Sequence, residues 1–135
     1  MRVFLDANIL FSAALPQSRM RAFLEIIFER ADCLLNDYAV EEARRNLELK
    51  FPVHLRQLDL LVKKCELITA LAARFEIELK SKDVPILAGA LAGNATHLLT
   101  GDEKDFGAFW GKTIQNVKIV SPKMLAAEFV KLGWL

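Results

Sequence analysis

Five acidic residues follow predicted strands or begin predicted helices, a placement that can bring them into one cleft. Asp6 comes after a short apolar run, Glu42 lies early in a predicted helix, Asp83 begins a helix, and Asp102 and Asp105 follow another apolar segment. Two carboxylates about 5 Å apart repel by about 3 kcal/mol at an effective dielectric of about 20. Such a cluster therefore binds a divalent cation or takes up protons. Oxygen ligands without cysteine or paired histidine favour Mg²⁺ or Mn²⁺ over Zn²⁺.

The hydrophobic pattern predicts the elements that must place these acids together. Apolar runs indicate strands, and apolar positions at helical spacing indicate helices. The predicted strands span 2–5, 34–35, 97–100 and 117–120, and the predicted helices span 19–31, 36–50, 54–64, 83–94 and 122–132. Because the strands alternate with helices and are apolar on both faces, we expect a three-layer α/β/α sandwich around a central, mostly parallel sheet. Ligands of such sheets bind beyond the carboxyl ends of the strands, where Asp6 and Asp102 are expected.

Capping residues indicate several helix ends. Asn36 is the predicted N-cap of one helix and Asp83 of another, and Gly93 with Asn94 ends that second helix. After the first strand the chain is expected to enter a loop or a helix start. The pattern is less clear in the remaining segments. There we expect a short helix at 105–110, a strand at 67–68, a helical turn at 71–75 and an extended piece at 77–79.

The composition is that of one ordinary globular domain over residues 1–135. Of its 135 residues, 53% are apolar and 26% are charged, which excludes a disordered or low-complexity chain. With 18 basic and 17 acidic residues the net charge is +1, so bulk charge identifies no partner. Cys33 and Cys65 lack metal-ligand spacing and are expected to be free thiols. No targeting segment and no apolar run of membrane-spanning length is visible, so we expect a cytoplasmic protein.

Each acid also has a purely structural interpretation. Asp6 can simply end a strand, but a carboxylate inside the stretch VFLDANIL is hard to bury without a partner. Glu42 can be a solvated helix residue, although it lies nearer the apolar stripe than its neighbour Glu41. The acids that suit helix caps or turns are Asp83, Asp102 and Asp105. The metal hypothesis therefore depends on the joint pattern.

Four stretches of the sequence carry a family resemblance. They are VFLDANILFSA at 3–13, NDYAVEEARRNL at 36–47, KDVPILAGALAGNATHLLTGDEKDF at 82–106 and VSPKMLAAEFV at 120–130. The third is the most specific, because an Asp opens a helix of small and apolar residues before a strand that ends in Thr-Gly-Asp. With these stretches in this order, the chain resembles PIN-domain nucleases, and most of all the small single-domain members that include VapC-type toxins.

The resemblance implies a catalytic role for four acids. Asp6, Asp83 and Asp102 match the acids that bind one or two Mg²⁺ or Mn²⁺ ions, directly or through water. Glu42 matches the acid that binds the metal or orients the attacking water. The implied activity is metal-assisted hydrolysis of RNA phosphodiester bonds by an endoribonuclease.

The resemblance also implies supporting residues and partners. Asn8 and Thr100 match groups that orient the metal ligands or bind phosphate, and Asp105 matches a variable fifth acid. The resemblance to these small single-domain nucleases also implies that the protein forms a homodimer. If the protein is a toxin, the resemblance also implies a small antitoxin whose tail covers the acidic cleft.

Basic and aromatic residues suggest further contacts. A basic excess between 44 and 64 predicts a surface that tracks an RNA backbone, with Arg44, Arg45 and Lys50 as candidate contacts; a solvated helix face is the alternative. His54 and His97 are expected to be structural or surface residues. The aromatic residues expected in the core or a dimer interface, rather than stacked on bases, are Phe106, Phe109 and Trp110.

Three other functions stay open. A phosphatase of the HAD type also begins with an Asp at a strand end and uses Mg²⁺, but it has a second Asp two residues later, where this chain has Asn8. A non-catalytic RNA-binding module on a PIN-like fold would need no intact acidic set. A DNA nuclease would share the same metal chemistry, because that chemistry does not sense the 2′-hydroxyl.

Overall fold

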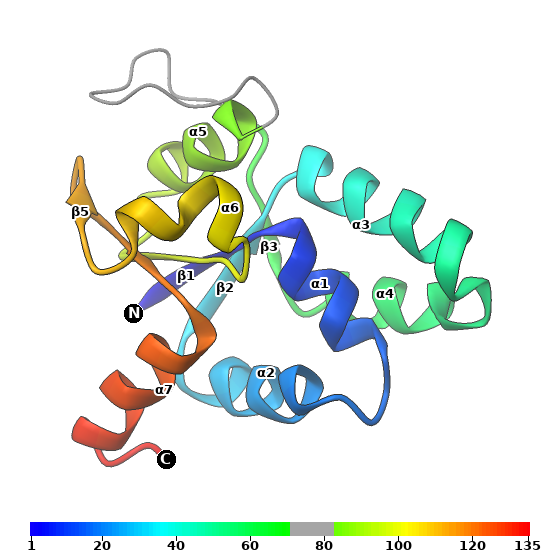
Figure 1. Ribbon diagram of the computed structural model, residues 1–135, viewed down its shortest axis with the longest axis horizontal. Coiled ribbons are helices and arrows are strands. Elements are labelled where there is room, and N and C mark those ends of the chain that lie inside the picture. The colour runs from blue at the N-terminus through cyan, green and yellow to red at the C-terminus, as the bar shows by residue number, and fades with distance from the viewer. Residues whose placement is uncertain (71–82) are drawn as a thin grey trace.

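The computed structural model describes residues 1–70 and 83–135, and the expectations for 71–75 and 77–79 lie outside these ranges. Six strands form one sheet in the order β3-β2-β1-β4-β6-β5 (Figure 1). They are β1 (Arg2–Leu5), β2 (Asp32–Leu35), β3 (Glu66–Leu67), β4 (His97–Leu99), β5 (Thr113–Ile114) and β6 (Val117–Val120). The β5–β6 pair is antiparallel and the other pairs are parallel, so the expected mostly parallel sheet is confirmed.

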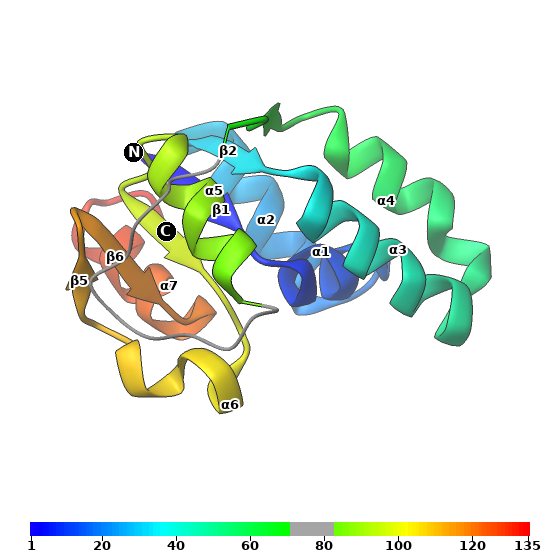
Figure 2. The same ribbon diagram turned by 90° about the horizontal axis from the view of Figure 1, so that it is seen from above.

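Helices cover both faces of this sheet. They are α1 (Ala7–Ala14), α2 (Arg19–Arg30), α3 (Asp37–Lys50), α4 (Leu55–Val62), α5 (Val84–Ala92), α6 (Glu103–Phe106) and α7 (Pro122–Lys131). Helix α5 lies on one face, whereas α2 and α7 lie on the other (Figure 1). Helices α1, α3 and α4 pack together on the side toward which β1 runs, in both views (Figures 1 and 2). Within the described ranges, no helix has the length and apolar character needed to cross a bilayer.

The two central strands explain why the sheet forms in this order. Val3, Phe4 and Leu5 of β1 and Leu98 and Leu99 of β4 are fully buried. Strands that are apolar on both faces need helices on both sides, and burying each large side chain contributes roughly 1.5–3 kcal/mol. In β1, Leu5 lies opposite Leu99 of β4, so the residues that follow these two strands emerge side by side.

Several elements differ from the sequence-based expectations. The short helix expected at 105–110 is α6 at Glu103–Phe106 followed by a 3-10 turn, and β2 begins two residues before the expected 34–35. Helix α1 is a full helix rather than a loop or helix start; six of its eight residues are apolar, and its polar side consists only of Asn8 and Ser12. Strand β3 spans Glu66–Leu67, one residue before the expected 67–68. Strand β5 is not among the expected strands. It has only two residues, and the turn that joins it to β6, Gln115–Asn116, contains no glycine to mark a hairpin. Both turn residues have positive φ, of 48° and 75°, as a two-residue hairpin requires.

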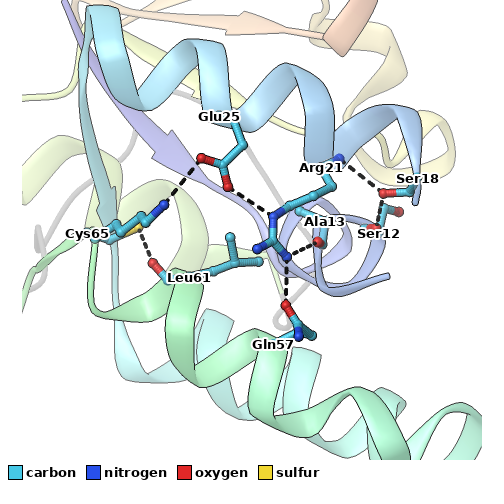
Figure 3. Close-up of polar contacts among 9 residues, drawn as sticks. Ser12, Ala13, Ser18, Arg21, Glu25, Gln57, Leu61 and Cys65 are labelled. Atoms are coloured by element: carbon cyan, nitrogen blue, oxygen red, sulfur yellow. Dashed lines mark hydrogen bonds and ion pairs between the residues drawn. The ribbon is translucent and has the colours of Figure 1, made fainter. Parts of the chain in front are cut away.

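Arg21 on α2 ties three helices together (Figure 3). Its Nε donates a 3.0 Å hydrogen bond to Glu25, and its Nη1 donates to the Ala13 carbonyl at 3.3 Å and to Gln57 Oε1 at 3.1 Å. These partners belong to α2, α1 and α4. The carbonyl at the end of α1 is thereby satisfied by a side chain, as helix C-termini require. Arg21 therefore holds α1, α2 and α4 together, and it does not line the acidic cleft described below.

Both cysteines are free thiols, as expected. Burial raises the pKa of Cys65 to about 12, and burial followed by the charges of Cys65 and Asp32 raises the pKa of the Cys33 thiol. Thiols of this kind are protonated and unreactive at neutral pH.

Candidate metal centre

The carboxyl ends of β1 and β4 open into a cleft of about 280 Å³. The acids that line it are Asp6, Glu42, Asp83 and Asp102. Asp6 follows β1 and Asp102 follows β4, while α3 and the residue before α5 supply the other two. The parallel topology therefore brings all four predicted catalytic acids to one edge of the sheet.

Asp6 is the N-cap of α1 and is only 4% exposed. Its Oδ1 accepts a hydrogen bond from the Ala7 N–H at 2.7 Å, and its Oδ2 accepts one from the Thr100 hydroxyl at 2.8 Å. Burial is the main reason that the pKa of Asp6 is raised to about 6; these hydrogen bonds oppose the shift, and the charges of Glu42 and Asp102 add to it. A cation in the cleft would favour the ionised carboxylate.

Three carboxylates form the tightest acidic cluster among the described residues. Asp83, Asp102 and Asp105 each place one oxygen within 4.8 Å of the others. Asp102 is the N-cap of α6 and accepts the Asp105 N–H at 3.0 Å. Asp83, 6% exposed, occupies the predicted N-cap position of α5, but its side chain makes no capping hydrogen bond to that helix. An all-oxygen anionic donor set of this kind fits Mg²⁺ or Mn²⁺.

Asn8 and Thr100 connect the acids to each other. Asn8 Nδ2 donates to Asp6 Oδ2 at 3.2 Å, and Asn8 Oδ1 accepts the Gly101 N–H at 2.8 Å. Thr100, fully buried, donates to Asp6 and accepts the Asp102 N–H at 3.1 Å. Both residues therefore orient the Asp6 carboxylate through hydrogen bonds, and they hold the backbone of Gly101 and Asp102 beside it.

The basic residues predicted to contact RNA fall in different places. Lys50 lines the cleft, but Arg45 is exposed outside its lining. Arg44 donates to Asp59 on α4 at 2.9 Å, so it contributes to helix packing. Asn46 also lines the cleft and was not predicted. The signal that identifies it is its helical spacing, four residues after Glu42 and four before Lys50.

The aromatic and histidine residues divide between core and surface. Phe106 is fully buried, and Phe109 and Trp110 pack partly buried against the core, as expected. His97 is structural as expected: its ring contacts the Thr96 hydroxyl at 2.7 Å and Glu128 Oε1 at 3.0 Å. None of these four residues lines the cleft.

Comparison with solved structures identifies the architecture. A chain in the crystal structure of VapBC2 from Rickettsia felis bound to a DNA fragment from their promoter matches with a TM-score of 0.65 and 20% identity, covering 90% of this chain and 98% of that chain. FitAcB from Neisseria gonorrhoeae matches with a TM-score of 0.58 and 21% identity, with coverage of 90% and 98%. VapBC-1 from nontypeable Haemophilus influenzae matches with a TM-score of 0.54 and 16% identity, and the match again covers 90% of this chain and 98% of that chain. No protein-family model and no curated protein matches the sequence.

The chain has a PIN-domain fold. The fold expected from the sequence resemblance is thereby confirmed. In this PIN-domain fold, β1 and β4 are neighbours at the centre of the sheet, and the acidic cleft lies where both strands end.

Proposed function

We propose that the protein is an Mg²⁺- or Mn²⁺-dependent endoribonuclease. The observation that carries the proposal is the cluster of Asp83, Asp102 and Asp105 beside the buried Asp6, at the carboxyl edge of a PIN-domain sheet. A phosphodiester is an anion and a bare acidic cleft repels it. A cleft of this composition therefore suits a phosphodiester only together with a cation that reverses its field.

The chain's own residues have distinct parts in this chemistry. Asp83 and Asp102, together with Asp6 or Asp105, would hold one or two ions. When bound, Mg²⁺ or Mn²⁺ polarises a phosphoryl oxygen, lowers the pKa of a bound water and stabilises the leaving oxygen. Glu42 would orient the attacking water and accept its proton.

The test is cleavage of a structured RNA with Mn²⁺, with Mg²⁺ and with EDTA. We expect the wild type to cleave only with metal and Asp6→Asn to be at least about 100-fold slower, because the substitution removes a negative ligand charge. Asp32→Asn is the matched control, since Asp32 begins β2 at the opposite edge of the sheet. Full activity of Asp6→Asn, or no metal-dependent cleavage, would contradict the proposal.

The same experiment separates the alternatives. Single-stranded DNA cut as fast as RNA would indicate a general nuclease. Release of phosphate from a phosphomonoester would favour a phosphatase; Asn8, which hydrogen-bonds to Asp6, stands where the HAD type has its second Asp. RNA binding that is insensitive to metal, without cleavage, would indicate a non-catalytic module.

We further propose that the protein is the toxin of a toxin–antitoxin pair and acts as a homodimer. The VapBC2, VapBC-1 and FitAcB structures to which the chain is similar support a small antitoxin as a partner. A neighbouring reading frame for a small DNA-binding protein, and relief of growth arrest on co-expression, would support the pair. Light scattering of the purified protein tests the dimer, and a monomer mass would contradict it.

A further inference from the structure

We propose that the end of α3 and the turn after it form a subsite for one nucleotide of single-stranded RNA. In this subsite Lys50 contacts a phosphate and Phe51 stacks on the adjoining base. The inference rests on the proposed nuclease function, because the subsite is where the RNA would run after it leaves the acidic cleft. We call the rings of Phe11, Phe51 and His54, with the Lys50 ammonium, the stacking subsite.

One face of α3 changes its chemistry along its length. Glu42, Asn46 and Lys50 are spaced four residues apart, so they share a helix face, and all three line the cleft. The face therefore runs from a carboxylate through an amide to an ammonium. Lys50 is the only basic residue in the described lining of the cleft, and it forms no ion pair with a described residue. Its charge is available to an anion that extends beyond the metal site.

Aromatic rings continue the path from Lys50 outward. Phe11 lines the cleft, and the Lys50 Nζ lies 5.6 Å from its ring centroid. The ring of Phe51 lies 6.1 Å from that of Phe11, and the ring of His54 lies 6.4 Å from that of Phe51. Phe51 is 42% exposed, so part of its ring is open to solvent. An exposed ring next in sequence to a lysine that forms no ion pair with a described residue suits a base and its phosphate, because proteins bind single strands by stacking bases on aromatic rings and pairing phosphates with cations.

A second hollow lies at the end of this row of tilted rings. It has a volume of about 460 Å³ and shares Phe51 and His54 with the stacking subsite. Its other walls come from the α1–α2 turn, at Leu15, Pro16, Gln17 and Ser18. The Ser18 hydroxyl is engaged, since it donates to the Ser12 carbonyl and accepts the Arg21 N–H, but the exposed Gln17 offers an amide. A mostly apolar hollow with one such amide suits a nucleobase face and its polar edge. Only an unpaired strand can present a base in this way, because a duplex hides its base faces.

Binding of a short single-stranded RNA in Mg²⁺, followed by fluorescence anisotropy, tests the subsite. The measurements use an Asp6→Asn background, so that the RNA stays intact, with melting temperatures as a check of folding. Phe51→Ala is expected to weaken binding roughly 5- to 100-fold, and Phe51→Trp to preserve it, because stacking needs a ring. Lys50→Gln is expected to reduce the slope of log affinity against log salt by about 0.7, the value for one phosphate contact on a single strand.

A control and a direct readout of stacking complete the test. Leu49→Ala should bind like the parent, since Leu49 is 83% exposed and lies in neither hollow. RNA containing 2-aminopurine should lose fluorescence on binding to the parent and to Phe51→Trp but not to Phe51→Ala. The subsite is overturned if no RNA binds or if Phe51→Ala binds RNA as tightly as the parent does. It is also overturned if the variants keep their RNA affinity and lose only the binding of a partner protein. Intact, Phe51-dependent binding without any metal-dependent cleavage in the wild type would instead overturn the proposed nuclease and leave the subsite standing.

Discussion

The hydroxyl of Thr100 donates a 2.8 Å hydrogen bond to Oδ2 of Asp6, across the junction of the two central strands. The oxygen of this Thr100 hydroxyl also accepts a hydrogen bond from the N–H of Asp102 at 3.1 Å. One buried hydroxyl thus links two acids that come from opposite halves of the chain. Hydrogen bonds of this kind fix the orientation of a carboxylate before any ligand arrives.

Thr100→Val should destabilise the protein by about 1–3 kcal/mol, because the buried Asp6 Oδ2 keeps only its weaker donor, Asn8, and the Asp102 N–H loses the Thr100 hydroxyl, while the side-chain shape is kept. Thr100→Ser retains the hydroxyl and should stay close to the wild type. Urea unfolding at pH 7 measures both. Equal stability of the Val and Ser variants would show that the hydrogen bond contributes nothing.

The raised pKa of Asp6 predicts how stability depends on pH in the absence of metal. Its ordinary pKa is 3.8 and its folded value is about 6. Between these values the folded protein keeps a proton that the unfolded chain has lost. The free energy of unfolding should therefore fall by about 3 kcal/mol as the pH rises from about 3 to about 7, with about 2 kcal/mol of that loss between pH 4 and pH 6. Glu42 and Asp102 strengthen this effect because their charges also face Asp6.

Asp6→Asn serves as the control for that pH dependence, since it has the same shape and does not titrate. Urea unfolding in EDTA between pH 4 and pH 7 should show a flatter profile and a higher stability at pH 7 than the wild type. Parallel profiles for the two proteins would contradict the assignment to Asp6.

Divalent metal should stabilise the folded protein even without a substrate. At a metal concentration about 100 times its Kd, binding to the folded state alone adds about 2.7 kcal/mol. Thermal unfolding with Mn²⁺ or Mg²⁺ against EDTA measures this gain. Asp102→Asn should abolish most of the gain, and Asp32→Asn should keep it, because Asp32 lies away from the cleft.

Gly89→Ala should destabilise the protein although alanine favours helices. A Cβ at Gly89 would lie 2.6 Å from Asn36 Nδ2 and 2.8 Å from the Phe4 ring. Overpacking of this kind costs typically about 1–3 kcal/mol, more than the roughly 0.5–1 kcal/mol that alanine gains in a helix. Asn36 Nδ2 donates to the Pro85 carbonyl at 3.0 Å, so the start of α5 near Asp83 should shift as well.

Gly107→Ala provides the comparison for that variant. A Cβ at Gly107 would lie 3.2 Å from Cγ of Glu103, whose side chain is flexible, and its next neighbours would be at ordinary contact distances of 3.8 and 3.9 Å. We expect its unfolding midpoint to stay near that of the wild type. A Gly89→Ala variant as stable as Gly107→Ala would refute the close packing of α5 on β1.

Local signals in the sequence predicted much of the fold. Asn36 was predicted to cap α3, and its Oδ1 accepts the Ala39 N–H at 3.0 Å. The apolar runs of β1 and β4 predicted the buried strands, because burial on both faces leaves a continuous apolar pattern. Helix α1 lacked such a signal, since it has only eight residues, six of them apolar, and its three consecutive apolar residues Ile9, Leu10 and Phe11 continue the apolar run of β1.

The details of the candidate site were harder to predict, because they depend on which face each side chain uses. The spacing of Glu42, Asn46 and Lys50 places them on one helix face, but that this face lines the cleft depends on how α3 docks beside α1. The sequence alone left Arg44 and Arg45 equally available for an RNA contact. The pairing of Arg44 with Asp59 on α4 is a tertiary contact that no local pattern encodes. The closeness of Asp105 to Asp83 likewise depends on how α6 turns back after β4.

The strand order has a consequence for how the protein is made. Asp6 and Glu42 precede β3, whereas Asp83 and Asp102 follow it, and β4 enters between β1 and β6. A nascent chain that has left the ribosome only as far as β3 holds two of the four acids and no central partner for β1. The four acids can therefore meet in one cleft only after β4 and the residues that follow it have been synthesised, late in the production of the chain.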